Sequence, residues 1–191
     1  MSRKPFYLLV ALALMASLTA SVHATKLVAL TDDELIDQAD AILTGRSVAA
    51  ESEWRGKMLM TAVSIEVGDV LKGGQAAAAG ARITVLVPGG IDRDRPVPIS
   101  VVFPGAPSIA SGEDLLLFLT SGGEPGSFFV TGLSQGKFSL AENAAGETVV
   151  YRDLGGVELV DDSGTRRGGR AAGTLARVKE RLAQRLAETN R

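Results

Sequence analysis

The residue types that could carry out chemistry are few in this chain of 191 residues. Cysteine is absent, and His23, near the N-terminus, is the single histidine. Thiol catalysis, disulfide bonds and cysteine-based zinc sites are therefore excluded. Serine, lysine and carboxylate side chains are the chemical groups that have to be considered.

Ser134 belongs to two short motifs that occur in enzymes. The segment Gly132-Leu133-Ser134-Gln135-Gly136 matches the G-x-S-x-G motif of α/β-hydrolases, which needs a helix after the serine and a histidine base. Ser134 and Lys137 also match S-x-x-K, in which both groups lie on one turn of a helix. The residues around Lys137 favour a strand, which would place the two side chains on opposite faces. We therefore expect no nucleophile here.

Pairs of carboxylates could hydrolyse glycosidic bonds without histidine or cysteine. Such an enzyme needs two acids at a fixed separation across a cleft, and it normally stacks sugars on aromatic rings, which form 5% of this chain. The candidate pairs are Glu51 with Glu53, Glu66 with Asp69, and Glu113 with Asp114. A carboxylate-dependent envelope enzyme is the alternative hypothesis, whereas the first expectation is a protein that is not an enzyme.

Two acidic segments could offer oxygen ligands to calcium, namely Asp92-Arg93-Asp94-Arg95 and Asp161-Asp162-Ser163-Gly164. A calcium site needs six or more oxygens. The first segment has two carboxylates that flanking arginines would neutralise, and the second has the residue types of a turn. We predict a salt-bridged loop and a turn, with no metal and no cofactor.

Trp54 and the segment 88–107 are the candidate partner contacts. Residues 88–107 contain five of the seven prolines, and a long irregular loop in a compact domain is often functional. An exposed tryptophan is a frequent hot spot of protein interfaces, although Trp54 could equally pack on the rim of the fold. We predict Trp54, Arg93 and Arg95 as partner contacts. Nucleic acid is disfavoured, because a single tryptophan offers no stacking platform and residues 25–160 are acidic.

The elements that must position these residues are mostly short strands. Residues 58–71 alternate between apolar and polar, so the face with Leu59, Val63, Ile65 and Val67 is the expected core. A further strand is expected at 41–48, joined to the strand at 58–71 through a hairpin turn at Trp54-Arg55-Gly56-Lys57. The remaining strands are expected at 82–87 (stopped by Pro88-Gly89-Gly90), 99–103 at an edge, 115–119 in the centre, 128–140 as one strand with a glycine bulge, 148–151 and 157–160. The predicted fold class is mainly β, a single antiparallel β-barrel (OB-like) or sandwich.

Helices are expected near both ends of this domain. Thr31 followed by Glu34 matches a capping box and predicts a short helix. Residues 174–189 form an amphipathic helix with one apolar stripe, made of Leu175, Val178, Leu182 and Leu186. The stripe could pack on the barrel, form a dimer, or bind an anionic membrane surface through the basic helix, so the oligomeric state stays open.

The N-terminal segment 1–24 has the pattern of a secretory signal peptide. Arg3 and Lys4 precede an apolar run of about 13 residues, which is too short to span a bilayer. Val22-His23-Ala24 supplies the small residues that precede cleavage, which we expect after Ala24. The mature protein is then periplasmic or secreted, with a β-barrel domain at 25–160, a glycine-rich linker at 161–173 and the helix at 174–189.

Three stretches between residues 39 and 120 carry a resemblance. They are 39–48 (ADAILTGRSV), 63–73 (VSIEVGDVLKG) and 105–119 (GAPSIASGEDLLLFL). In this order they resemble secreted bacterial proteins without an assigned activity, and they are distantly similar to the netrin-module and metalloproteinase-inhibitor superfamily. The resemblance implies an OB-type barrel and partner binding. The inhibitors of that superfamily approach zinc through an N-terminal cysteine, which this chain lacks, so no inhibitory residue is carried over.

Overall fold

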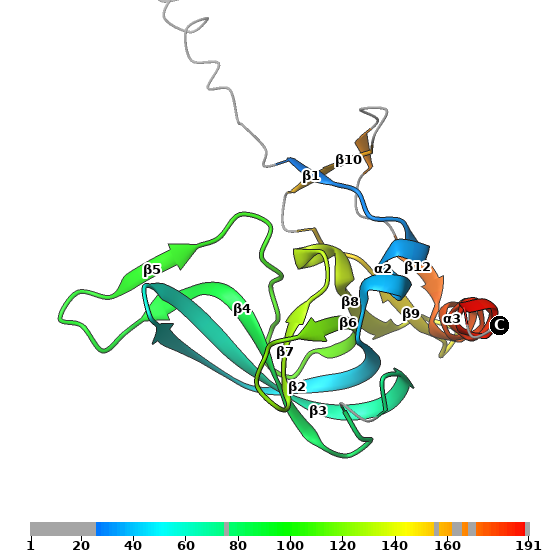
Figure 1. Ribbon diagram of the computed structural model, residues 1–191, viewed down its shortest axis with the longest axis horizontal. Helices are drawn as coiled ribbons and strands as arrows, with labels where there is room; N and C mark the ends of the chain where they lie inside the picture. The colour runs from blue at the N-terminus through cyan, green and yellow to red at the C-terminus, as the bar shows by residue number, and fades with distance from the viewer. Residues whose placement is uncertain (1–25, 75–76, 155–156, 162–165, 168–170, 190–191) are drawn as a thin grey trace, which may run out of the picture.

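A computed structural model describes residues 26–74, 77–154, 157–161, 166–167 and 171–189. The predicted signal peptide at 1–24 lies outside the described residues. The described chain is mainly β (Figure 1), with strands β1 (Lys26–Val28), β2 (Ala41–Arg55), β3 (Met58–Lys72), β4 (Arg82–Asp92), β5 (Ile99–Val102), β6 (Asp114–Ser121), β7 (Ser127–Val130), β8 (Lys137–Glu142), β9 (Thr148–Tyr151), β10 (Glu158–Val160), β11 (Arg166–Arg167) and β12 (Ala171–Thr174). The helices are α2 (Asp32–Gln38), α3 (Leu175–Thr189) and the 3-10 turn η1 (Leu133–Gly136).

The main sheet has the strand order β12-β9-β8-β6-β2-β3-β4-β5, and β7 pairs with both β4 and β6. The pairing of β4 with β7 is parallel, as is the pairing of β1 with β10 in a small second sheet. The main sheet is therefore mixed, which corrects the expectation of a purely antiparallel fold. The parallel pairing arises because β7 lies between two strands, β4 and β6, that run in opposite directions.

The predicted hairpin around Trp54 is confirmed by β2 and β3, which pair from Arg55 and Met58 at the turn back to Ile42 and Lys72. The turn contains Gly56, whose φ of 65° lies in the left-handed region that glycine adopts without a steric penalty.

The segment Pro88-Gly89-Gly90 makes a corner in β4, although it was expected to stop the strand. β4 pairs with β3 as far as Pro88, and from Gly89 it pairs with β5 instead. Gly90 has a φ of 141°, and a Cβ atom there would collide with the hydroxyl groups of Ser52 and Thr61. The absence of a Cβ atom at Gly90 thus lets β4 pass close to Ser52 on β2 and Thr61 on β3 and continue to Asp92. The resulting β4–β5 ribbon projects from the body at the left of Figure 1.

Two apolar cores lie on opposite faces of β6. Leu115, Leu117 and Leu119 face the first core, which also contains buried residues of β2, β3, β4 and β7. Leu116 and Phe118 face the second core, together with residues of α2, β8, β9 and α3. Burial on both faces explains why residues 115–119 are continuously apolar, and it confirms their central position.

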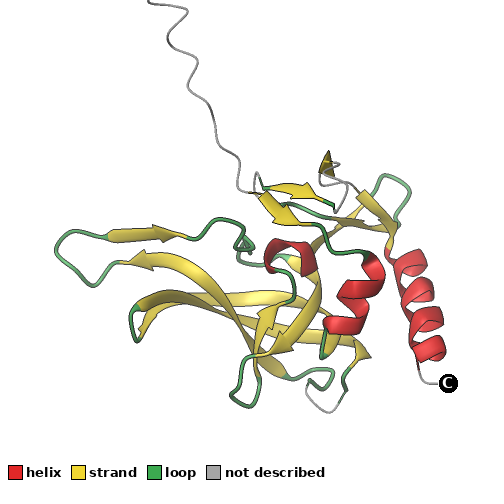
Figure 2. Ribbon diagram, turned by 45° about the horizontal axis from the view of Figure 1, so that its top comes forward, coloured by secondary structure: helices red, strands yellow, loops and turns green. Residues whose placement is uncertain are grey.

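The two helices cover the second core (Figure 2). Helix α2 has the predicted capping box: Thr31 accepts a hydrogen bond from the Glu34 amide, and the Glu34 carboxylate accepts one from the Thr31 amide. The stripe of α3 packs on this core, with Leu182 only 3% exposed. The stripe is thus covered by its own chain, which was one of three expected arrangements. No helix among the described residues is long and apolar enough to cross a membrane.

Two segments differ from the expectation. Residues 128–140 form β7, η1 and β8 instead of one strand, because the positive φ angles of Gly132 and Leu133, 64° and 59°, interrupt the extended backbone. Both strands run antiparallel to β6, so the chain keeps its direction. In the segment 161–173, expected to be a linker, the described residues include β11 and part of β12, and β12 pairs with β9. β12 is held by backbone hydrogen bonds to the edge strand β9, and such bonds form without an alternating pattern of side chains.

Candidate functional site

The end of the β2–β3 hairpin and the start of the loop after β4 are joined by a tryptophan, an aspartate and an arginine. The Trp54 indole Nε1 donates a hydrogen bond of 2.7 Å to Asp92 Oδ2. Arg95 Nε donates to the same oxygen at 2.8 Å, and its guanidinium lies 5.5 Å from the centre of the Trp54 ring. Two of the predicted contact residues, Trp54 and Arg95, thus form one cluster with Asp92 as its centre.

Asp92 is the buried member of this cluster, with 8% of its surface exposed. The hydrogen bond from Trp54 and then that from Arg95 lower the pKa of Asp92, because both stabilise the carboxylate. Trp54 keeps 43% of its surface exposed, so its ring remains accessible beside the arginine. The third predicted contact residue, Arg93, is exposed in the loop between β4 and β5 and takes no part in these bonds.

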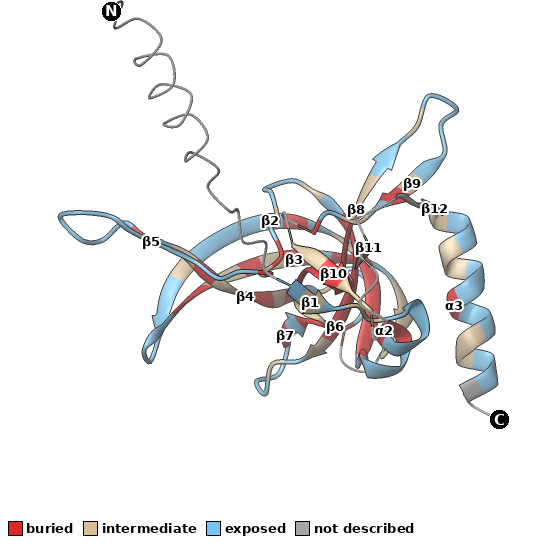
Figure 3. Ribbon diagram, turned by 90° about the horizontal axis from the view of Figure 1, so that it is seen from above, coloured by how far each residue is buried: buried red, intermediate tan, exposed pale blue. Residues whose placement is uncertain are grey.

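The β4–β5 ribbon exposes apolar side chains along its length, and Figure 3 shows β5 in the colour of exposed residues. All four residues of β5 are exposed, and Val102 reaches 84%. The exposed apolar residues of the ribbon are Ile91, Val97, Ile99, Val101, Val102 and Phe103. We call this set the apolar ribbon. The sequence did not predict this exposure, because the pattern of residues 99–103 also fits an edge strand with one face buried.

A salt bridge connects the hairpin end with a second loop. Arg55 Nη1 lies 3.7 Å from Glu124 Oε2 in the loop between β6 and β7. The hairpin end therefore lies beside two loops, since the Trp54 cluster also joins it to the loop after β4. These three segments are far apart in the sequence but form one end of the molecule.

A second polar cluster is buried beside β6 and β8. The Lys137 ammonium donates hydrogen bonds to Glu113 Oε1 at 2.5 Å and to Ser139 Oγ at 2.8 Å, and Ser139 Oγ donates to Glu113. The Lys137 side chain is only 4% exposed. Burial raises the pKa of Glu113, but hydrogen bonds from Lys137, Ser139 and the Ala110 amide outweigh this effect and lower it overall. The Glu113 carboxylate is thus stabilised in its charged form.

This cluster holds the chain in place and engages the Lys137 ammonium in hydrogen bonds to Glu113 and Ser139. Glu113 Oε2 accepts a hydrogen bond from the Ala110 amide, and Ser47 Oγ accepts one from the Glu113 amide. Ser134, the serine of the two sequence motifs, is 1% exposed, and its hydroxyl has no partner within the described part of the chain. Lys137 bonds to Ser139 instead of Ser134, so the structure does not pair the serine and the lysine of the S-x-x-K motif.

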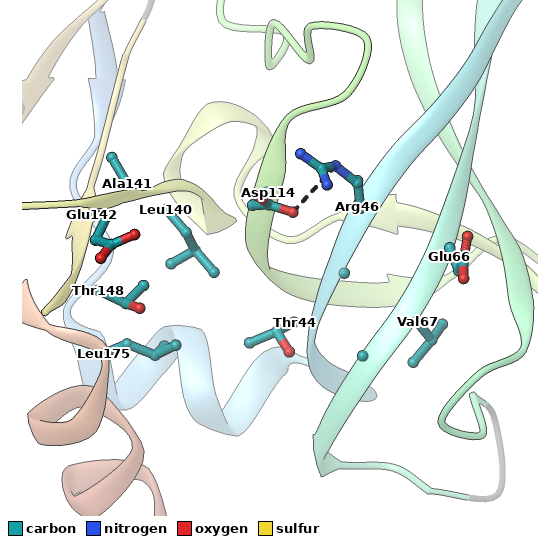
Figure 4. Close-up of a pocket in the computed structure, with 12 residues that line it drawn as sticks. Thr44, Arg46, Glu66, Val67, Asp114, Leu140, Ala141, Glu142, Thr148 and Leu175 are labelled. Carbon is teal, nitrogen blue, oxygen red and sulfur yellow. Dashed lines mark ion pairs between the residues drawn. The ribbon is translucent and has the colours of Figure 1, made fainter. Parts of the chain in front are cut away.

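An open groove runs beside β2, β3 and β6 (Figure 4). Its acidic lining residues are Glu66, Asp114 and Glu142. Asp114 lies 3.5 Å from Arg46, while Glu66 and Glu142 stand at opposite sides of the groove in Figure 4. Glu113 points away into the buried cluster, so the expected pair of Glu113 with Asp114 is not brought together. No group of three or more potential metal ligands occurs among the described residues.

Comparison of the chain with protein-family models, with curated proteins and with solved structures finds no match. The function therefore has to be argued from the residues and their geometry.

Proposed function

We propose that this protein is a binding module outside the cytoplasm, and that its apolar ribbon and the Trp54 cluster together contact a protein partner. The observation that carries the proposal is the exposure of Ile91, Val97, Ile99, Val101, Val102 and Phe103 on one projecting ribbon. Val102 shares one face of the ribbon with Ile91, and Ile99 and Val101 lie on the other face. Exposed apolar side chains gathered on one element are a typical mark of an interaction site. The signal-peptide pattern at 1–24 supports the proposed location.

The partner that fits this ribbon is a protein with an apolar surface, rather than a strand that extends the sheet. Pro98 and Pro104 flank the short strand β5 and remove backbone donors at both ends. Proline and short length are devices that protect sheet edges from pairing with other chains. Docking by side chains is therefore favoured over strand addition. Arg95 beside the Trp54 ring supplies the polar rim of such a site.

We further propose that the body is an OB-like barrel. The strand pairings run from β2 to β3, β4, β7, β6 and back to β2, which is a ring of five strands. OB-folds bind ligands with strands 2 and 3 and with the loops between strands 1 and 2 and between strands 4 and 5. Counted along this chain, strands 1 to 5 of the ring are β2, β3, β4, β6 and β7. The two corresponding loops are therefore the turn of the Trp54 hairpin and the β6–β7 loop, which the Arg55–Glu124 salt bridge connects. This correspondence supports a binding surface at the same end.

The test is site-specific photo-cross-linking in the cell envelope and the secreted fraction. A photoreactive amino acid replaces Val102 on the ribbon or, as a control, Val28, which is also well exposed at 68% but lies on β1. We expect one protein to cross-link through position 102 and not through position 28. The purified partner should bind the unmodified protein and the Val28→Asp variant equally well.

The Val102→Asp variant should bind this partner at least about tenfold more weakly, because burying a valine contributes about 1.5 kcal/mol and a buried carboxylate adds a desolvation cost. Val102 is so exposed that this substitution leaves the fold intact, which circular dichroism checks. The proposal is overturned if position 102 gives no specific cross-link, if it cross-links only to a second copy of the chain, or if Val102→Asp binds like the unmodified protein.

A further inference from the structure

A second site lies on the other side of the molecule, beneath helix α3. A cavity of about 270 Å³ is enclosed between α2, α3 and the face of the sheet formed by β6 and β8. Its residues divide into an apolar interior and a charged mouth: Leu35, Ile36, Phe118, Phe138, Val178 and Leu182 line the interior, and Asp32, Arg177 and Arg181 line the mouth. We call this cavity the α3 pocket.

The interior of the α3 pocket is made of side chains that are sheltered from water. Phe118 and Phe138 form its floor, with ring centres 5.6 Å apart and planes tilted by 50°, and both are at most 5% exposed. Leu35 and Leu182 on the facing helices are 0% and 3% exposed. An apolar cavity of this kind is a favourable environment for a hydrocarbon group.

The mouth of the α3 pocket carries an excess of positive charge. Asp32 is the one acid among the described lining residues, and Arg181 Nη1 lies 3.3 Å from its carboxylate. Arg152 lies 3.6 Å from the same carboxylate and stacks on the Phe138 ring at 4.5 Å. Arg177 is a further cation at the mouth. Two guanidinium groups thus share the Asp32 carboxylate and a third lines the mouth, and this charge balance favours an anionic headgroup.

Arg152 adds an independent sign that the charge near the pocket is incompletely satisfied. Its Nε atom is buried and has no hydrogen-bond partner within the described part of the chain. Burial lowers the pKa of Arg152, and Asp32 opposes this effect. A buried donor without a partner costs free energy that an additional acceptor would recover.

We propose that the α3 pocket binds a small amphipathic anion, with its hydrocarbon chain between Phe118, Phe138 and Leu182 and its carboxylate at Arg177 and Arg181. A cavity of about 270 Å³ holds about nine groups of the size of a water molecule, at about 30 Å³ each. That volume matches an unbranched chain of about eight carbons. The ligand class is therefore a medium-chain carboxylate, and the site is separate from the apolar ribbon.

The ligand would enter through the charged mouth beside helix α3. Two surface ion pairs help hold it to the body, Lys179 with Asp69 at 2.6 Å and Arg185 with Asp37 at 2.7 Å. Exposed pairs of this kind contribute at most about 1 kcal/mol each. Most of the attachment of α3 comes from its apolar stripe on the second core, so the helix stays in place while the ligand enters through the mouth.

The test is isothermal titration calorimetry of the purified protein with octanoate, and with octanol as the uncharged comparison. We expect octanoate to bind at one site, and octanol to bind more weakly. The double variant Arg177→Gln/Arg181→Gln should weaken octanoate binding by about tenfold and leave octanol binding unchanged. Lys179→Gln is the matched control, since it removes one cation and one ion pair of α3 outside the pocket. The affinity of this variant for octanoate should differ less than about twofold from that of the unmodified protein.

The apolar part is tested by Val178→Phe, which places a ring in the pocket and should abolish binding of both ligands. Circular dichroism checks that this variant is folded, and the arginine variant tests the proposal independently if it is not. Absence of octanoate binding overturns the proposal, as does an affinity that Val178→Phe leaves unchanged in a folded protein. If Arg177→Gln/Arg181→Gln and Lys179→Gln change the affinity for octanoate equally, the placement of the carboxylate at Arg177 and Arg181 is overturned.

Discussion

The buried ion pair of Lys137 with Glu113 allows a quantitative test of the structure. We consider the variant Lys137→Met, which keeps the length and the apolar stem of the side chain but removes the charge. The two side chains are 4% and 18% exposed, so solvent replaces little of the lost interaction. Removing one partner of a buried pair typically costs 3–5 kcal/mol, because the other charge is left without compensation.

The expected cost for this protein lies at the lower end of that range. Glu113 keeps two hydrogen bonds in the variant, from Ser139 Oγ and from the Ala110 amide, which partly stabilise the remaining carboxylate. We therefore expect Lys137→Met to lower the free energy of unfolding by about 3 kcal/mol at pH 7. The melting temperature should fall by roughly 6 to 12 °C for a protein of this size.

The assay is urea denaturation followed by circular dichroism, with two further variants. In Lys137→Met/Glu113→Gln the uncompensated charge is absent, so the double variant should be more stable than Lys137→Met alone. Lys179→Met breaks the exposed pair with Asp69 and should cost less than about 1 kcal/mol. A cost below about 1 kcal/mol for Lys137→Met, or a double variant no more stable than the single one, would refute the reasoning.

Three further predictions concern pH, the corner in β4 and helix α3. Folding lowers the pKa of Glu113, so its carboxylate adds to the free energy of unfolding above the unfolded pKa of about 4.3, and this contribution is lost as the pH falls through the native pKa. In urea titrations, Glu113→Gln should therefore lose less stability between pH 5 and pH 3 than the unmodified protein. Gly90→Ala should cost about 2 to 3 kcal/mol, since φ is 141° and the new Cβ collides with two hydroxyls, whereas Gly123→Ala, with open space around it, should cost about 1 kcal/mol in the same assay. Leu182→Ala should cost about 2 to 4 kcal/mol and speed amide hydrogen exchange in α3, and an unchanged exchange rate would contradict its packing on the second core.

Much of the local structure could be predicted because its signals are local. The capping box of Thr31 and Glu34 requires residues three apart, and the turn at Gly56 requires one flexible residue between alternating strands. The expectation that Pro88-Gly89-Gly90 stops the strand was wrong, because β4 continues through a corner there to Asp92. A glycine pair shows that the backbone is unusual there, but the hydroxyls of Ser52 and Thr61 that exclude a Cβ atom belong to distant strands.

The candidate site could be predicted in part. Trp54 and Arg95 were predicted as contact residues, and Asp92, which bonds to both, was predicted to belong to a salt-bridged loop. Its salt bridge to Arg95 is confirmed, but its burial was not predicted. The apolar ribbon was missed because the sequence around Val102 does not tell whether a neighbouring strand covers it. Likewise, the apolar stripe of α3 was recognised, but its partner on the second core was not.

By itself the sequence determined the short helices, the Trp54 hairpin, the central position of residues 115–119 and the absence of thiol chemistry, since each depends on residue type and short-range spacing. The tertiary structure alone decided that β7 lies parallel to β4, that Lys137 is buried against Glu113, and that two arginines, Arg152 and Arg181, pair with Asp32. These contacts join residues tens of positions apart, and their free energy arises only when folding removes the groups from water. A local pattern therefore identifies the elements, whereas packing decides which side chains are exposed for a partner and which surround a cavity.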